Sequence, residues 1–325
     1  MCIKVNISMI RALCFIAFIF LMVCAPGCGK NSSGGDLKKE KQRLSVFVSI
    51  TPVKYLLEEI GGENVEVEVL LPPGRDLHVF EPTGKQILKL SESDIFFTVG
   101  LPFEHHVESK IPRGKKIVDL TQGVTFRNFT GHSCSSGHDD HADHDDHANH
   151  DDHADHDDHA EHTGSGAFDP HIWLGPAQLE VMAHTVFSAL IAHDHASQDY
   201  YQQRYDSFIK KLHDTASYCS QKLKAKRGGV VMVFHPSFGY FFDHFDLTQR
   251  AIEVDGKSPS AKQIMTMIME AKKLQITTLF VQPQFDKASA TAIARALNGT
   301  VRPLDPLAED VLGNFREMAD AISDN

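Results

Sequence analysis

The chain has 325 residues and carries 32 Lys or Arg against 43 Asp or Glu, a formal net charge of −11 at pH 7. One segment, residues 132–162, holds eleven Asp or Glu and no Lys or Arg, so the remainder of the chain is close to neutral. Because binding to nucleic acid needs a basic face, this charge balance excludes nucleic acid as an expected partner.

The N-terminus has the form of a targeting segment. Residues 1–12 are basic and hold no acid, and the apolar run at 13–24 is too short to span a bilayer comfortably. The sequence APGC then ends at Cys28, which resembles a bacterial lipoprotein signal and predicts a membrane anchor through lipidated Cys28. An ordinary secretory signal is the alternative. Both interpretations predict an extracytoplasmic protein, in a periplasm or at the cell surface.

Composition divides the chain into five expected regions. Beyond Cys28 the cysteines are Cys134 and Cys219, so no disulfide framework is implied. About 280 residues follow the polar spacer, which is enough for two domains. We expect a signal peptide over 1–27, a flexible spacer over 28–43, an N-terminal α/β domain over 44–176, a helical region with a long linking helix over 177–227 and a C-terminal α/β domain over 228–325.

Strands and helices alternate after the spacer. Short apolar runs rich in Val, Ile and Phe predict strands, and segments with helical spacing separate them. This alternation is typical of parallel βαβ units. The expected strands are 43–50, 65–71, 95–99 and 116–120, and the expected helices are 52–60 and 85–90.

The segment 130–167 is predicted to be a disordered loop within the first domain, because it holds too few apolar residues to form a core. Its imidazoles suit Zn, Cu, Ni and Fe, and the carboxylates between them attract divalent cations. We interpret the loop as an auxiliary metal collector; a solvated low-complexity loop with no role is the alternative. The histidines that recur at every third residue are His138, His141, His144, His147, His150, His153, His156, His159 and His162.

A long helical region follows the loop. Residues 176–192 and 198–226 have helical spacing, the second over about eight turns, and Gly228-Gly229 is expected to end it. A second alternation then begins. Its expected strands are 230–234, 249–254, 278–282 and 300–303, and its expected helices are 238–245, 261–274, 288–297 and 309–323.

The predicted fold class is therefore α/β, with two α/β domains joined by one long helix. Ligands of such sheets bind outside the carboxyl ends of the strands. Binding sites also favour the boundary between domains. We expect the functional site in the interdomain cleft.

Three histidines outside the loop share one kind of position, at a strand end or in a loop beside a proline or a turn. His78 lies in PPGRDLHVFEPTG, His171 in DPHIWL and His235 in VVMVFHPSFGYFF. Neutral imidazoles on separate loops can converge on one Zn²⁺ at about 2.0–2.1 Å, with water or a carboxylate in the fourth position. The sequence therefore predicts a three-histidine metal site.

The remaining histidines outside the loop are expected at the surface. Two of them, His105 and His106, are placed in a loop after a strand, from which they could also face the cleft. The others are predicted to lie on helices or at helix ends with their side chains in solvent, and they are His184, His193, His195, His213 and His244.

Six segments also carry a family resemblance. In their order along the chain they resemble the signature segments of the zinc-specific, ZnuA-like lipoproteins, the extracytoplasmic solute-binding proteins of metal ABC transporters (cluster A-I). The resemblance runs from residue 44 to residue 325 and is interrupted only by the loop. The segments are HVFEPTG, DPHIWLGP, FHPSFGYF, VDGKSPSAKQI, FVQPQF and LDPLAED.

The resemblance implies two four-stranded, mainly parallel α/β domains bridged by a rigid long helix, with a metal at their interface. It implies His78, His171 and His235 as ligands, where manganese-selective relatives usually place Glu at the position of His235. Those relatives add an acidic ligand near the segment QPQFD, which makes Asp286 a candidate fourth ligand. The implied function is a monomeric receptor, not an enzyme, that binds Zn²⁺ as transported ligand and delivers it to a membrane permease and its ATPase.

Three alternatives stay open at this point. A manganese or iron receptor belongs to the same class, and an extracytoplasmic zinc buffer or adhesin would use the same metal site without transport. A zinc hydrolase would also use three protein ligands and an open position. Hydrolysis would need a general base such as the Glu of an H-E-x-x-H motif, and the sequence contains no such motif.

Overall fold

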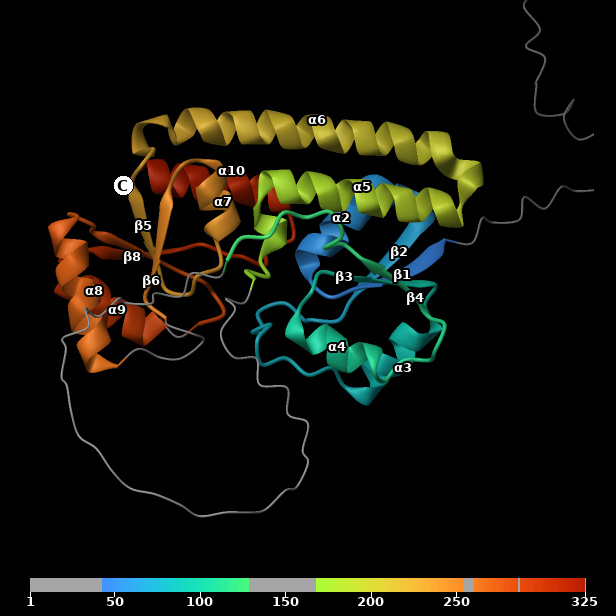
Figure 1. The fold of residues 1–325 in the computed structure, drawn as a ribbon, viewed down its shortest axis with the longest axis horizontal. Helices are drawn as coiled ribbons and strands as arrows, with labels where there is room; N and C mark the ends of the chain where they lie inside the picture. The colour runs from blue at the N-terminus through green and yellow to red at the C-terminus, as the bar shows by residue number, and fades with distance from the viewer. Residues whose placement is uncertain (1–42, 129–167, 254–259, 286, 325) are drawn as a thin grey trace, which may run out of the picture. The chain divides into compact units, whose positions relative to one another are not determined.

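The computed structural model describes residues 43–128, 168–253, 260–285 and 287–324 (Figure 1). The predictions on Cys28, on the histidine-rich loop and on Asp286 fall outside these residues and stay predictions. Within the described ranges, no helix is both long and apolar enough to cross a membrane.

The first half of the described chain forms a four-stranded parallel sheet with the strand order β2-β1-β3-β4. Every residue of β3 (IFFT) is buried, as expected for a strand of a parallel sheet that is covered on both faces. The strands are β1 (Leu44–Val48), β2 (Val65–Val69), β3 (Ile95–Thr98) and β4 (Lys116–Asp119), and the helices between them are α2 (Thr51–Gly61), α3 (Gly84–Glu92) and α4 (Pro102–Glu108).

The second half repeats this topology. Its sheet is again four-stranded and parallel, with the order β6-β5-β7-β8. In each half the first and third strands are therefore neighbours. The chain passes from the first strand to the second on one side of it and then continues with the third strand on its other side. Ligands of such sheets bind at the point between the first and third strands, where the connections diverge. The strands are β5 (Val230–Val233), β6 (Thr248–Ala251), β7 (Thr278–Val281) and β8 (Thr300–Pro303), and the helices are α7 (Gly239–His244), α8 (Ala261–Lys273), α9 (Lys287–Ala296) and α10 (Val311–Ser323).

Two helices connect the halves. α5 (Pro176–His193) begins with a proline at its first turn, where the missing N–H costs nothing. α6 (Gln198–Lys222) packs against α5, against α2 of the first half and against α10 of the second (Figure 1). The predicted fold class, two four-stranded α/β units and one long helix, is confirmed. The domain boundaries expected from composition stay a prediction.

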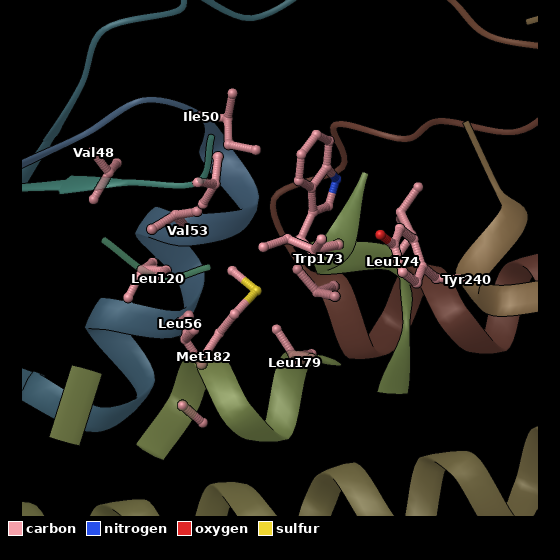
Figure 2. Close-up of a cluster of buried hydrophobic side chains, with 14 of the residues drawn as sticks. Val48, Ile50, Val53, Leu56, Leu120, Trp173, Leu174, Leu179, Met182 and Tyr240 are labelled. Carbon is pink, nitrogen blue, oxygen red and sulfur yellow. The ribbon is translucent and has the colours of Figure 1, made fainter. Parts of the chain in front are cut away.

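The larger of two hydrophobic clusters among the described residues extends through both halves, and the smaller one lies within the second half. The larger cluster includes β1 and β3 of the first sheet, α5 and α6, and Val233 and Phe280 of the second sheet. Figure 2 shows part of it, where side chains of α2 and α5 meet the segment around Trp173. The Trp173 ring is fully buried, and its Nε1 donates to the carbonyl of Pro306 at 2.7 Å. This hydrogen bond therefore links Trp173, which lies just before α5, to the second half of the chain.

One helix was not predicted. α4 carries His105 and His106, so the expectation that these residues lie in a loop is wrong, although both are exposed as expected. The segment PFEHHVE has only seven residues and no clear apolar periodicity, which is why its pattern did not indicate a helix. It begins with Pro102 at the first turn, and local hydrogen bonds to Glu104 hold its start.

Glu104 is a buried carboxyl group that supports the turn between β3 and α4. Its side chain accepts hydrogen bonds from the N–H groups of Val99, Gly100 and Leu101 at 2.8–3.1 Å. Burial raises the pKa of Glu104 to about 7, and the hydrogen bonds from the backbone N–H groups oppose that rise. Between about pH 4.5 and pH 7, the folded protein therefore binds more protons at Glu104 than the unfolded chain does.

This shift predicts a pH-dependent term in stability. A carboxyl pKa raised by folding contributes stability that is present below its unfolded value and is lost as pH rises through about 7. We expect Glu104→Gln to remove a decline in the free energy of unfolding of about 1–3 kcal/mol between pH 4.5 and pH 7.5. Urea unfolding at several pH values measures it. The exposed Glu92→Gln should keep the wild-type slope, and an equal slope in Glu104→Gln would contradict the assignment.

Candidate metal site

His78 lies in the segment that connects β2 to α3. Its backbone N–H donates to Asp76 Oδ1 at 2.8 Å, which stabilises the local turn. The side chain belongs to an exposed residue at the mouth of the site.

His171 lies directly before a short 3-10 helix, Ile172–Leu174, whose three residues are all buried. The His171 side chain is fully buried too. Asp169 Oδ1 lies 2.8 Å from the ring Nδ1 and also accepts the backbone N–H of His171 at 3.0 Å. The packing of the 3-10 helix and this carboxylate therefore define the direction of the ring.

His235 follows β5 at the carboxyl edge of the second sheet, where the α/β fold predicts a ligand site. The buried amide of Gln282 pairs with its backbone: Nε2 donates to the carbonyl of His235 at 2.6 Å, and Oε1 accepts its N–H at 3.2 Å. Glu253 Oε2 lies 2.5 Å from the ring Nδ1, and the Phe285 ring stacks on the imidazole at a centroid distance of 5.1 Å.

The three histidines converge, as the sequence predicted. Their ligand atoms all lie within 4.8 Å of one another, and the Nε2 atoms of His78 and His235 are 3.0 Å apart. Two nitrogens bound to one tetrahedral Zn²⁺ at 2.0–2.1 Å are about 3.3 Å apart. Small side-chain shifts would therefore let all three rings bind one ion. His171 Nε2 is buried and has no hydrogen-bond partner among the described residues.

The protonation of these rings also suits a metal. Although His78 is exposed as a residue, its ring packs against those of His171 and His235. The desolvation of the ring, followed by the charges of His235 and His171, lowers the pKa of His78 to about 4. Burial also lowers the pKa of His171, although Asp169 opposes the change. Both rings are therefore neutral near pH 7, and the neutral imidazole is the form that binds a metal.

Two carboxylates select which ring nitrogen faces the ion. Asp169 and Glu253 each accept a hydrogen bond from an Nδ1–H group, which leaves Nε2 of His171 and His235 with its lone pair. Carboxylate–histidine–metal arrangements of this kind fix the tautomer and raise the basicity of the ligand. Asp169 Oδ2 in turn accepts from Arg127 Nη1 at 2.8 Å. These side chains form the outer layer of the site.

A small pocket lies among the three histidines, with a volume of about 10 Å³. This is room for one ion or one water molecule. A larger cavity of about 190 Å³ is lined by Val230 and Thr278, the first residues of β5 and β7. It therefore lies at the amino edge of the second sheet, opposite the carboxyl edge that carries His235. The small pocket is the candidate site because it alone of the two contains the histidines. Its lining is Asp76, Leu77, His78, His171, His235, Ser237, Gln284, Phe285, Pro306 and Leu307.

Sequence reasoning missed the residues that support the ligands. Asp169 stands two positions before His171, a spacing that could have indicated an Asp–His pair. Glu253 lies 18 residues after His235, and its position depends on β6 lying beside β5. No local pattern identifies Gln282, because its role comes from pairing with the backbone of a neighbouring strand end.

The other predicted histidines do not join the site. Within the described ranges, His78, His171 and His235 form the one group of three or more His, Cys, Asp or Glu side chains close enough to hold an ion. The side chains of His184, His193, His195, His213 and His244 are exposed, as predicted.

Comparison with known proteins agrees with this architecture. The sequence profile of a family described as “Zinc-uptake complex component A periplasmic” matches residues 46–325. The high-affinity zinc uptake system protein ZnuA of Bacillus subtilis (strain 168) is 24% identical over 296 residues, which cover 90% of this chain and 86% of that protein. The manganese ABC transporter substrate-binding lipoprotein PsaA of Streptococcus pneumoniae is 22% identical, with 87% of this chain and 84% of that protein covered.

Solved structures give the same result. A crystal structure of ZnuA superimposes with a TM-score of 0.73 at 31% sequence identity, and the match covers 87% of this chain and 99% of that one. The fold and the site define a class, the metal-binding receptors built from two parallel α/β units. Since the profile spans most of the sequence, the chain belongs to the zinc-uptake component A family of substrate-binding components of metal ABC uptake systems.

Proposed function

We propose that the protein captures Zn²⁺ outside the cytoplasmic membrane and delivers it to an ABC permease driven by an ATPase. His78, His171 and His235 are the proposed ligands. The observation that carries this proposal is the convergence of three imidazoles within 4.8 Å, two of them oriented through Nδ1 by buried carboxylates. The function is that of a receptor rather than an enzyme.

The donor set favours zinc over manganese. Three neutral nitrogens suit a tetrahedral Zn²⁺, whereas Mn²⁺ prefers more oxygen ligands and a higher coordination number. Among the described pocket residues Asp76 is the sole carboxylate, and its Oδ1 already accepts the N–H of His78. Among the described residues, the pocket therefore offers an ion one carboxylate against three imidazoles, which supports Zn²⁺ as the transported ion.

The decisive experiment is the metal content of the protein after purification from medium that contains zinc, manganese and iron at equal concentrations. Mass spectrometry of intact protein and of protein lacking residues 132–162 should find one zinc that is retained in both. Manganese or iron as the retained metal would overturn the choice of zinc, and no retained metal would overturn the receptor function.

The histidine-rich loop is proposed to collect ions and pass them to the site. A segment that must order on binding holds each ion more weakly than a preformed pocket does. Calorimetry should therefore show weak additional equivalents that vanish when 132–162 is deleted. The Asn128–Phe168 bridge and the stacked Phe126 and Phe168 rings lie outside the deleted stretch and keep its base intact. Loss of the tight equivalent on deletion would refute the collector role.

The proposed location is extracytoplasmic, with a lipid anchor on Cys28 and a monomeric mature chain. Lipoprotein maturation adds more than one acyl chain, which stable anchoring requires. Intact-mass analysis of the membrane fraction should find acylated protein that begins at Cys28. A soluble product with another N-terminus and no acyl mass would contradict this proposal.

The carboxylates behind the ligands should contribute to affinity without binding the ion. We expect Asp169→Asn and Glu253→Gln each to weaken zinc binding by about 10–100-fold, because the rings lose a charged partner at Nδ1. Competition with a chelator measures this. Glu180→Gln is the matched control, since Glu180 pairs with the exposed His213 at 3.1 Å away from the site. Unchanged affinity in both site variants would show that the carboxylates play no part.

A further inference from the structure

Two buried oxygens in the metal pocket have no hydrogen-bond partner among the described residues. They are the hydroxyl of Ser237 and the side-chain carbonyl oxygen of Gln284, and both residues line the pocket with the three histidines. A buried polar atom without a partner is uncommon and costs free energy. When several lie around one pocket, a bound ion or water is the usual explanation.

The orientation of the Gln284 amide is determined by Asp305. Asp305 Oδ1 accepts from Gln284 Nε2 at 2.8 Å and from the N–H of Leu307 at 2.9 Å. Reversal of the amide would place its carbonyl oxygen against this carboxylate, which is unfavourable. Gln284 therefore presents an oxygen that can accept a hydrogen bond but cannot donate one.

We propose that Gln284 and Ser237 hold a water molecule that completes the coordination of the bound ion. The proposal rests on the metal-receptor function above and names the residues that define the fourth position. The three imidazoles leave one position of a tetrahedral ion for a further ligand. A metal-bound water donates its protons, and Gln284 Oε1 accepts one of them.

This arrangement makes the fourth position selective for a neutral ligand. An anion such as azide has no proton to donate, so it would face the Gln284 oxygen without a hydrogen bond. Asp76, at the same pocket, adds a negative charge that also disfavours anions. The ion therefore keeps a ligand that exchanges readily, which suits a receptor that must later release its metal.

The test uses full-length protein loaded with less than one equivalent of Co²⁺, so that the tightest site fills first. Visible absorption reports the coordination of Co²⁺, and azide is titrated into wild type, Gln284→Leu and Ser237→Ala. We expect Gln284→Leu to bind azide about tenfold more tightly than wild type, the equivalent of one hydrogen bond. Ser237→Ala should change the visible absorption of the azide-free cobalt protein, because the bound water loses one of its two partners. The hydroxyl can also donate to azide, so the absorption, and not azide affinity, is the readout for this variant. Gln202→Leu is the matched control, because Gln202 Nε2 also pairs with a carboxylate, at 2.8 Å, on the exposed face of α6.

The outcomes separate this proposal from the function on which it rests. If wild type shows no tight equivalent, the receptor function itself fails. If wild type holds one ion but both variants keep its azide affinity and absorption, the assignment of Gln284 and Ser237 is overturned while the function stands. Should Gln284→Leu fail to fold, the azide-free cobalt absorption of Ser237→Ala decides alone. A change of the cobalt spectrum in Asp286→Ala, with no azide response in wild type, would assign the fourth position to Asp286 and overturn the proposal.

Discussion

Replacing His235 with alanine should reduce zinc affinity by more than about 100-fold, beyond the loss expected for a residue that only supports a ligand. The variant removes one of three nitrogens and leaves Glu253, now without its ring partner at 2.5 Å, beside the pocket. A buried carboxylate that has lost its partner also disfavours the folded state. Competition with a chelator, on protein lacking 132–162, measures the affinity.

His235→Glu separates loss of a ligand from a change of ligand type. It adds an oxygen and a negative charge, so we expect the preference for zinc over manganese to narrow. The new carboxylate would lie next to Glu253, and a bound ion would offset their repulsion. His213→Ala, which removes an exposed histidine on α6, should leave both affinities unchanged. Wild-type zinc affinity in His235→Ala, or a wild-type preference for manganese at equal free concentrations, would show that the site is assigned wrongly.

Replacing Trp173 with alanine should lower the free energy of unfolding by about 3–5 kcal/mol, the usual cost of emptying a large buried aromatic site. The ring is fully buried in the core shared by both halves, and its loss leaves the carbonyl of Pro306 without its donor. Because the Trp173 ring lies 5.4 Å from that of His171, zinc affinity should fall as well. Urea unfolding of metal-free protein, followed by circular dichroism, measures the stability.

Leu88→Ala serves as the control for Trp173→Ala. Leu88 is 61% exposed on α3, so its truncation should change stability by no more than about 0.5 kcal/mol. Trp173→Phe keeps most of the buried ring but not the donor, and it should lie between wild type and Trp173→Ala. A loss below 1 kcal/mol in Trp173→Ala would mean that this residue does not hold the two halves together.

Much of the architecture follows from local patterns. Each expected strand is present, with ends that differ by a few residues, because buried runs such as IFFT and VVMV have no competing local structure. The long helix is present because apolar side chains recur along it with helical spacing. α4 was missed because its start depends on Glu104 reaching the N–H groups of the preceding turn, a contact that no short-range periodicity encodes.

The sequence by itself determined the alternation of strands and helices, the family resemblance and the three candidate histidines, since each depends on residues close together in the chain. Only the tertiary structure brought His78 and His235 to 3.0 Å across 157 positions and placed Glu253 and Gln282 behind His235. Such contacts depend on strand order and on the packing of the two halves against each other. The ring nitrogen that faces the ion and the orientation of the Gln284 amide therefore depend on the tertiary structure.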